Sequence, residues 1–186
     1  MASNPAAAAG ATPASAPPPD DWMTSISRQM HGMSSGDRAA LRRMELTRSP
    51  GADAVAIKTL LRADVPESRI RDDWPRLRLI GHFAGLLSGT AALYPHDERR
   101  GVGAALFEAG FSEKRLLRLL ASRGEALGDQ LALAVRILSR ERLAVNLWDL
   151  YHLLGGDPVK SDAARLRMAR HYYAAQARHS AAPARP

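Results

Sequence analysis

Apolar residues recur at helical spacing along most of the chain, most clearly at 112–142, SEKRLLRLLASRGEALGDQLALAVRILSRER. Placed at about 100° per residue, this stretch predicts two amphipathic helices that join near Gly124. The apolar positions are Leu116, Leu117 and Leu120 in the first helix, and Leu127, Leu131, Val135 and Leu138 in the second. Ser112 is suited to cap the first helix, with Glu113 near its positive end. We therefore expect both helices to pack into a helical core.

The same periodicity predicts helices in most of the remaining sequence. They are expected at about 22–33, 37–46, 54–62, 74–94, 102–109, 143–154 and 159–179. Ser49-Pro50-Gly51 and the GGDP segment at 155–158 are expected to break helices. The predicted fold is all-α, with eight or nine helices in two small bundles and no sheet.

Some packing positions follow from these patterns. In the short helix at 54–62, either Val55 and Ile57 or Leu60 and Leu61 should be buried. The other expected packing residues are Leu41, Met44 and Leu46; Leu143, Leu147, Leu150, Leu153 and Leu154; and Leu166, Ala169, Tyr172 and Tyr173.

The composition of the ends sets the expected domain boundaries. We expect a disordered, alanine- and proline-rich tail at 1–20, an amino-terminal bundle at 21–95, a carboxyl-terminal bundle at 101–178 and a frayed tail at 179–186. The first tail lacks the basic start and continuous apolar stretch of a signal peptide. The nearly uncharged segment at 79–94 is shorter than the ~20 residues that span a bilayer. A cytoplasmic protein without membrane contact is expected.

Composition and charge narrow the function. Aromatic residues make up 5% of the chain, which disfavours β-sandwiches and barrels, and the absence of cysteine excludes disulfides and thiol catalysis. The net charge is +7 and the pI is near 10.5, which favours an acidic partner such as nucleic acid. Only Lys58, Lys114 and Lys160 are lysines, so the basic residues are mostly arginines, whose planar guanidinium groups suit phosphate oxygens.

The two helices at 112–142 present such arginines opposite their apolar sides. Arg115 and Arg118 in the first helix, and Arg136 and Arg140 in the second, have no acidic residue four positions away. With few aromatic residues expected to be free to stack on bases, we predict phosphate-backbone binding without sequence readout.

Signals for an enzyme are weak. His96-Asp97 suggests the metal-binding dipeptide of helical phosphohydrolases, but no further ligands have suitable spacing, so His96 is expected to be a solvated loop residue. Gly101-Val-Gly103 does not continue as a dinucleotide-binding loop. His82 is expected to be a hydrogen-bonded interior histidine. We predict no catalytic residue, metal, cofactor or small-molecule substrate.

The order of four motifs resembles a known family. These motifs are GDRAALRR at 36–43, GVGAALFEAGFSEKRLLRLLASR at 101–123, LALAVRILSRERLAVNLWDLYHLL at 131–154 and RLRMARHYY at 165–173. Together they resemble the CasB family, the small subunit of the type I-E CRISPR surveillance complex Cascade, over roughly residues 22–175. The amino-terminal tail has no counterpart in the family, and 66–101 matches only in helical character.

The resemblance implies a non-catalytic, all-helical subunit present in two copies beside the backbone subunits and the large subunit. Its implied partners are these subunits, the crRNA, and the target and non-target DNA of the R-loop, to whose stability it contributes. Among the basic residues, Arg115 lies in the SEKR motif, and Arg136 lies in the VR of the next helix. Arg42 and Arg43 lie in the first motif. Family members often have a basic residue in the turn after the SEKR helix, and Arg123 takes its place at a shifted position. The full candidate set is Arg42, Arg43, Lys114, Arg115, Arg118, Arg123, Arg136, Arg140 and Arg142.

Two other kinds of protein remain as alternatives. A free-standing basic helical protein that binds nucleic acid or regulates genes should carry a recognition helix and bind duplex DNA alone. A helical metallohydrolase should bind metal through His96 and Asp97.

Overall fold

The computed structural model describes residues 21–44, 49–88 and 94–181, and helices make up nearly all the regular structure of these ranges. The helices are α1 (Trp22–Gly32), α2 (Ser35–Arg42), α3 (Pro50–Arg62), α4 (Glu67–Asp72), α5 (Trp74–Leu87), α6 (Val102–Glu108), α7 (Glu113–Ala121), α8 (Gly124–Arg140), α9 (Leu147–Leu153) and α10 (Pro158–Ala181). The β-structure among the described residues is a single parallel bridge between His96 and Val145. The all-α prediction is confirmed.

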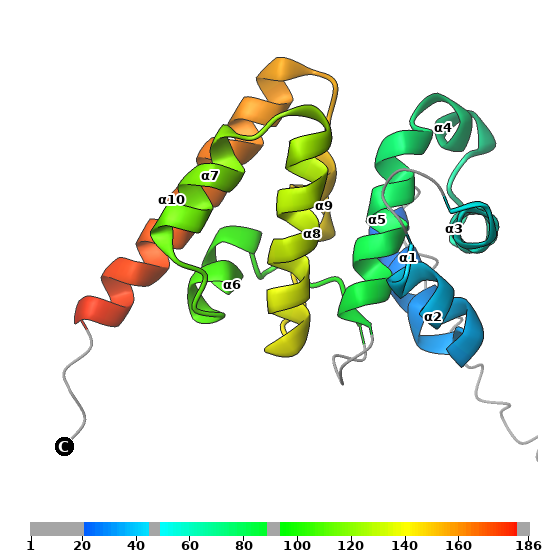
Figure 1. Ribbon diagram of the computed structural model, residues 1–186, viewed down its shortest axis with the longest axis horizontal. Helices are drawn as coiled ribbons and strands as arrows, with labels where there is room; N and C mark the ends of the chain where they lie inside the picture. Colours follow the sequence, from blue (N-terminus) through cyan, green and yellow to red (C-terminus); the bar gives the residue numbers. More distant parts are fainter. Residues whose placement is uncertain (1–20, 45–48, 89–93, 182–186) are drawn as a thin grey trace, which may run out of the picture.

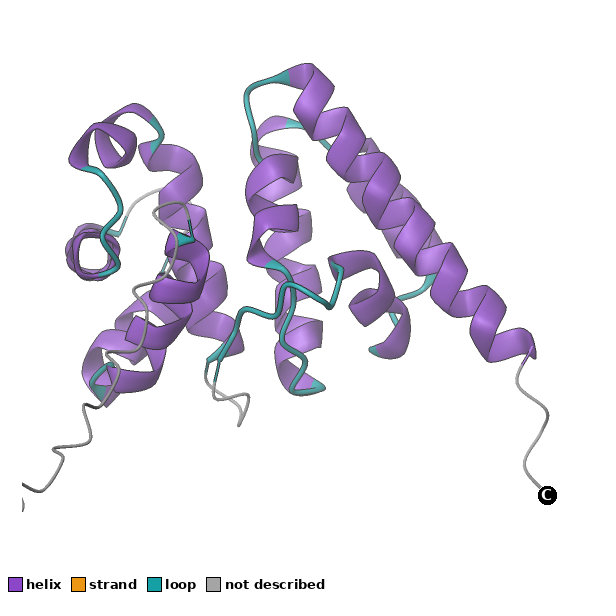
Figure 2. Cartoon of the chain, turned by 180° about the vertical axis from the view of Figure 1, so that it is seen from behind, coloured by secondary structure: helices purple, strands orange, loops and turns teal. Residues whose placement is uncertain are grey.

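Helix α5 lies between α8 and the helices α1 to α4 (Figure 1). It packs against α1, α2, α3 and α4, and also against α8 and α9. Because it has neighbours on so many sides, it is apolar nearly all round, and its residues from Ile80 to Leu87 are all buried. Helix α10, the longest, packs along α6, α7 and α9 and forms an outer edge of the molecule, as the view from behind also shows (Figure 2). The division into two bundles stays a prediction.

The described helices number ten, one more than the upper expectation, because α4 was not predicted. This helix has six residues and buries only Ile70, so it shows no apolar period. The Ser49-Pro50-Gly51 segment lies between two helices as predicted, but α3 begins within it rather than at residue 54, with Ser49 as N-cap and Pro50 at the first position. Proline is compatible with a first turn because its missing N–H would have no partner there.

The start of α9 also differs from the prediction, which began this helix at Leu143. Helix α8 ends at Arg140, and Arg142 just beyond it adopts a left-handed φ of 57°, while the Leu143 N–H donates to Leu138 O at 3.0 Å. This pattern of bonds closes a helix end even without glycine. Residues 143–146 then form an irregular segment, and Asn146 caps α9 by accepting from Trp148 N–H at 2.9 Å.

Some packing predictions are wrong. In α7, Leu117 is 53% exposed and Leu119 is buried in its place. In α10, Leu166 is 73% exposed, whereas Arg165 is buried and donates from Nη1 to Leu120 O at 2.7 Å. In α3, neither predicted pair is buried as a pair, since Leu60 is inside but Leu61 is largely exposed. The predicted apolar stripe of α8 is confirmed, because all four of its residues are buried.

The Gly101-Val-Gly103 segment has a packing role where α6 crosses α10. A Cβ on Gly103 would lie 1.9 Å from Met168 O, and one on Gly101 would lie 2.1 Å from His171 Nδ1. Two helix backbones can approach this closely only where a residue has no side chain. The glycines therefore serve helix packing, which agrees with the rejection of a dinucleotide loop.

Parts of some predictions fall on residues that the structure does not describe. These are the tail at 1–20, Leu46, the end of the helix expected to reach residue 94, and the last residues of the tail at 179–186. Helix α5 ends at Leu87, and α10 continues to Ala181. Within the described ranges, no helix combines the length and the apolar character needed to cross a membrane.

Candidate nucleic-acid interface

A basic groove lies where the end of α2 meets the second half of α8. Arg42 is the last residue of α2 and Arg43 is its C-cap, whereas Arg136 and Arg140 lie one turn apart on α8. All four line one open groove of about 510 Å³. The other described residues that line it are Ala39, Leu86 and Ser139. Four of the predicted residues are thus brought together from positions more than ninety residues apart in the sequence.

Helix α5 holds both sides of this basic groove in place through buried polar contacts. On the α2 side, His82 Nδ1 lies 2.7 Å from the carbonyl oxygen of Leu41, which directly precedes Arg42. On the α8 side, the hydroxyl of Ser139, next to Arg140, donates to Leu86 O at 2.7 Å. Hydrogen bonds of this kind fix the separation of the helices because a buried polar group left without its partner is costly.

The contact between α2 and α5 is unusually close. A Cβ on Gly85 would lie only 2.7 Å from Leu41 Cβ, so the absence of a side chain at Gly85 lets α2 approach. Burial lowers the pKa of His82, and the nearby charges of Arg136 and Arg78 lower it further. His82 is therefore neutral at pH 7 and acts as a structural contact beneath the groove, as predicted for an interior histidine.

The groove is positively charged, and no acidic residue is found among the described residues that line it. Within the described part of the chain no ion pair involves any of its four arginines. Arg43 donates from Nε to Ala39 O at 3.3 Å, and the side chains of Arg42, Arg136 and Arg140 are exposed. Guanidinium groups in such a setting can each offer a pair of N–H donors to a phosphate.

The remaining candidates lie outside the basic groove. Lys114, Arg115 and Arg118 are exposed on α7, which packs on α8 and α10, and none of them lines the groove. Arg123 is the N-cap of α8, and its exposed guanidinium forms a 3.4 Å ion pair with Asp162. Arg142 is exposed just after the end of α8. The structure therefore separates Arg115 from Arg136, the two residues that the family motifs favoured.

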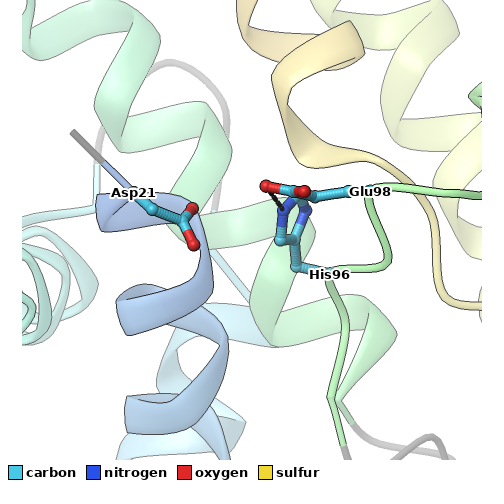
Figure 3. A group of neighbouring side chains, drawn as sticks. All are labelled: Asp21, His96 and Glu98. Atoms are coloured by element: carbon cyan, nitrogen blue, oxygen red, sulfur yellow. Dashed lines mark ion pairs between the residues drawn. The ribbon is translucent and has the colours of Figure 1, made fainter. Parts of the chain in front are cut away.

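His96 is not the solvated loop residue that the sequence predicts. Its side chain is only 2% exposed, because the loop folds back so that Asp97 N–H donates to Val145 O at 3.0 Å. The carboxylate of Glu98 lies against its ring, and Asp21, at the start of α1, lies nearby (Figure 3). One ligand atom from each of these three residues lies within 4.8 Å of the others, whereas Asp97 is not part of the group.

The protonation of His96 argues against a metal at this position. Its Nδ1 accepts from Leu147 N–H at 3.0 Å, so the neutral ring carries its proton on Nε2. That proton faces the carboxylates, and Nε2 lies 3.9 Å from a Glu98 oxygen. A metal on Nε2 would require both ring nitrogens to be deprotonated. Asp21 already caps α1 by accepting from Thr24 N–H at 3.2 Å. The group therefore acts as a structural contact between α1, this loop and α9.

His96 gives a testable pH dependence. Burial lowers its pKa below the ordinary value of 6.5, although the nearby carboxylates of Asp21, Glu98 and Asp97 act in the opposite direction. As the pH falls, His96 is protonated in the unfolded chain before it is protonated in the folded chain. The stability that neutral His96 contributes is therefore complete above about pH 6.5 and is lost as the pH falls through the lower folded-state pKa. The melting temperature should therefore decrease between pH 7 and pH 5.

The matched variant is His96→Asn, whose Oδ1 can accept from Leu147 N–H but does not titrate. Its melting temperature should fall less between pH 7 and pH 5 than that of the wild type. The decrease that remains in the variant is due to other groups such as His82, whose pKa is also lowered. Equal decreases for both proteins would show that His96 does not contribute.

Comparisons with known proteins add to this geometry. The family model described as CRISPR-associated protein Cse2 matches residues 37–173. A solved structure of a CRISPR-associated protein of the Cse2 family from Thermus thermophilus is similar, with a TM-score of 0.57 and 22% sequence identity over 84% of this chain and 98% of that chain. At this identity the structural match shows a shared fold. Comparison with curated proteins gives no match.

Proposed function

Since the chain belongs to the Cse2 family of CRISPR-associated proteins, the small subunit of type I-E Cascade, we propose that it stabilises the crRNA-guided R-loop by binding nucleic-acid backbone in its basic groove. The family match covers most of the chain, and it includes Arg42, Arg43, Arg136 and Arg140. This membership favours a Cascade subunit over a free-standing regulator.

The basic groove is the observation that carries the proposal. Its arginines come from two helices that are fixed to a third, so the spacing of the helices that carry them is set before nucleic acid arrives. Preorganised cations that contact phosphates give affinity and orientation but carry no sequence information. That division of labour suits a guided complex, in which pairing with the crRNA supplies the specificity.

The role we propose is non-catalytic. The groove contacts the backbone of the displaced DNA strand or of the crRNA–target duplex, and the exposed cations of α7, Lys114, Arg115 and Arg118, form a second contact area. No step in this role requires a metal, a cofactor or a small-molecule substrate.

The proposed partners are the other Cascade subunits, the crRNA and a second copy of this chain, in the cytoplasm. Exposed apolar side chains are available for such subunit contacts. Val159 and Leu166, 78% and 73% exposed, are seven residues apart and therefore lie on the same side of α10.

Reconstitution of target binding tests the proposal. The remaining Cascade subunits with crRNA should bind target DNA weakly alone and tightly after addition of the wild-type chain. The chain should enter the assembled complex, and by mass the complex should contain two copies. If the chain neither assembles nor improves binding, the proposed role is wrong. Tight binding of duplex DNA by the isolated chain, without assembly, would instead favour the free-standing regulator.

A further inference from the structure

A second cavity, of about 370 Å³, lies apart from the basic groove and has aromatic walls. Trp22 from α1 and Trp148, Tyr151 and His152 from α9 line it. The ring centroids of Trp22 and Trp148 lie 4.6 Å apart in an edge-on arrangement, and Trp148 and His152 are nearly parallel, with 23° between their planes. Trp22, Trp148 and His152 line the cavity and are only partly buried, so each of these residues keeps some exposed surface.

The edge of this aromatic pocket is cationic. Arg69 from α4, Arg76 from α5 and Lys160 from α10 line it, against the single carboxylate of Asp157. Asp157 accepts from the N–H groups of Val159 and Lys160 at 3.0 and 3.3 Å, so its carboxylate is already hydrogen-bonded to the backbone at the start of α10. Arg76 is held by Asp73 at 2.8 Å and lies over the Tyr151 ring at 4.2 Å.

Arg69 and Lys160 are the two cations that remain available to a ligand. Arg69 is exposed and forms no ion pair with any described residue, whereas Lys160 has only a 3.8 Å contact with Asp157 and a side chain that is 72% exposed. Aromatic surfaces next to free cations match the two parts of a nucleotide, because the base stacks on a ring while the phosphate pairs with the cation.

We infer that this aromatic pocket receives one unpaired nucleotide, with its base against Trp148 and Trp22 and its phosphate on Arg69 and Lys160. The volume lies near the lower end of the range for small-ligand sites and suits a single nucleotide rather than a duplex. The inference rests on the proposed function for its source of nucleic acid. It departs from the sequence-based expectation that few aromatic residues are free to stack on bases.

The aromatic pocket and the basic groove are distinct sites. Arg76 lines the pocket near the start of α5 and Leu86 lines the groove near its end, ten residues further on. At a rise of 1.5 Å per residue this separation is roughly 15 Å along the helix. Variants at one site can therefore be made without altering the other.

Tryptophan emission tests the inference directly. Trp74 lines neither site, so the full-length Trp74→Phe chain reports from Trp22 and Trp148. A thymidylate decamer should quench this emission, and a decamer of the same length without bases should not. Because the stacking of one base contributes to the binding free energy, Trp148→Leu should weaken binding of the thymidylate decamer by at least about fivefold. Unchanged emission with the thymidylate decamer, or equal binding of the two decamers, would overturn the inference.

Removal of the cations provides a second test that does not disturb packing. Arg69→Ala/Lys160→Ala should weaken binding of the thymidylate decamer by about fivefold or more, because both side chains are exposed phosphate partners. The matched control is Arg71→Ala. Arg71 lies on α4 like Arg69, but its guanidinium is paired to Asp72 and lies outside the pocket, so this change should alter binding by less than about twofold. Equal effects of the two changes would contradict a phosphate site at the pocket.

The same decamers separate the two proposals. Arg136→Ala/Arg140→Ala in the basic groove should weaken both decamers alike, whereas Trp148→Leu should affect only the one with bases. If only the groove variant has an effect, the pocket inference fails and the proposed function stands. If only the pocket variants have an effect, the nucleotide site stands and the groove is not the backbone contact.

Discussion

Arg136→Ala/Arg140→Ala is expected to weaken R-loop formation by the reconstituted complex by at least about tenfold. The two guanidinium groups lie one turn apart on α8 and line the basic groove together with Arg42 and Arg43. A hydrogen bond to a charged group contributes about 1.5–3 kcal/mol, and each 1.4 kcal/mol is a factor of ten in affinity. Titration of target DNA against the complex with wild-type or variant chain measures the loss.

The matched control removes the same charge elsewhere. Arg170 and Arg178 are exposed on α10, outside the groove, so Arg170→Ala/Arg178→Ala should change binding by less than about twofold. Neither pair of arginines is buried, so both double variants should keep the wild-type melting temperature and enter the complex. Equal losses from both variants would indicate a general effect of charge and contradict a defined groove.

Gly103→Ala is expected to destabilise the fold by about 3 kcal/mol. The added Cβ would lie 1.9 Å from Met168 O and 2.9 Å from Tyr172 N, both of them backbone atoms of α10. A flexible side chain could move aside, but here α6 and α10 must separate as whole helices. Such overpacking typically costs 1–3 kcal/mol and occasionally more. For a chain of this size the melting temperature should fall by roughly 6–12 °C.

Gly36→Ala is the control for this change. Gly36 lies in α2, and a Cβ there would have no atom within 4 Å. Alanine is favoured over glycine in a helix by up to about 1 kcal/mol, so the control should keep or slightly raise the melting temperature. A Gly103→Ala protein that melts like the wild type would show that α6 and α10 do not approach as closely as the structure has them.

The helices of this chain could largely be predicted because amphipathic periodicity is local. In α8 the residues at Leu127, Leu131, Val135 and Leu138 are all buried, and Arg136 and Arg140 face outward as expected. The pattern was less decisive where apolar residues crowd together. Helix α7 has leucines at 116, 117, 119 and 120, so a helical wheel over two turns could not choose between Leu117 and Leu119 as the buried residue.

The sites depend on long-range contacts that no local pattern encodes. Arg42 and Arg136 line one groove because His82 and Ser139 form hydrogen bonds that join α5 to α2 and α8, and these polar contacts have no period in the sequence. The charged surroundings of His96 are typical of a solvated loop, and its burial depends on the segment around Val145, far along the chain. Trp22 and Trp148 likewise form one pocket only after the chain has folded.

The salt dependence of R-loop formation tests the central claim most directly. Each phosphate contact contributes about 0.7–0.9 to the slope of log K against log salt concentration. If Arg136 and Arg140 each bind a phosphate, the slope for complexes with Arg136→Ala/Arg140→Ala should be shallower than the wild-type slope by about 1.4–1.8. The Arg170→Ala/Arg178→Ala control should retain the wild-type slope. Parallel lines for wild type and the groove variant would mean that the groove does not contact phosphates, and would contradict the account.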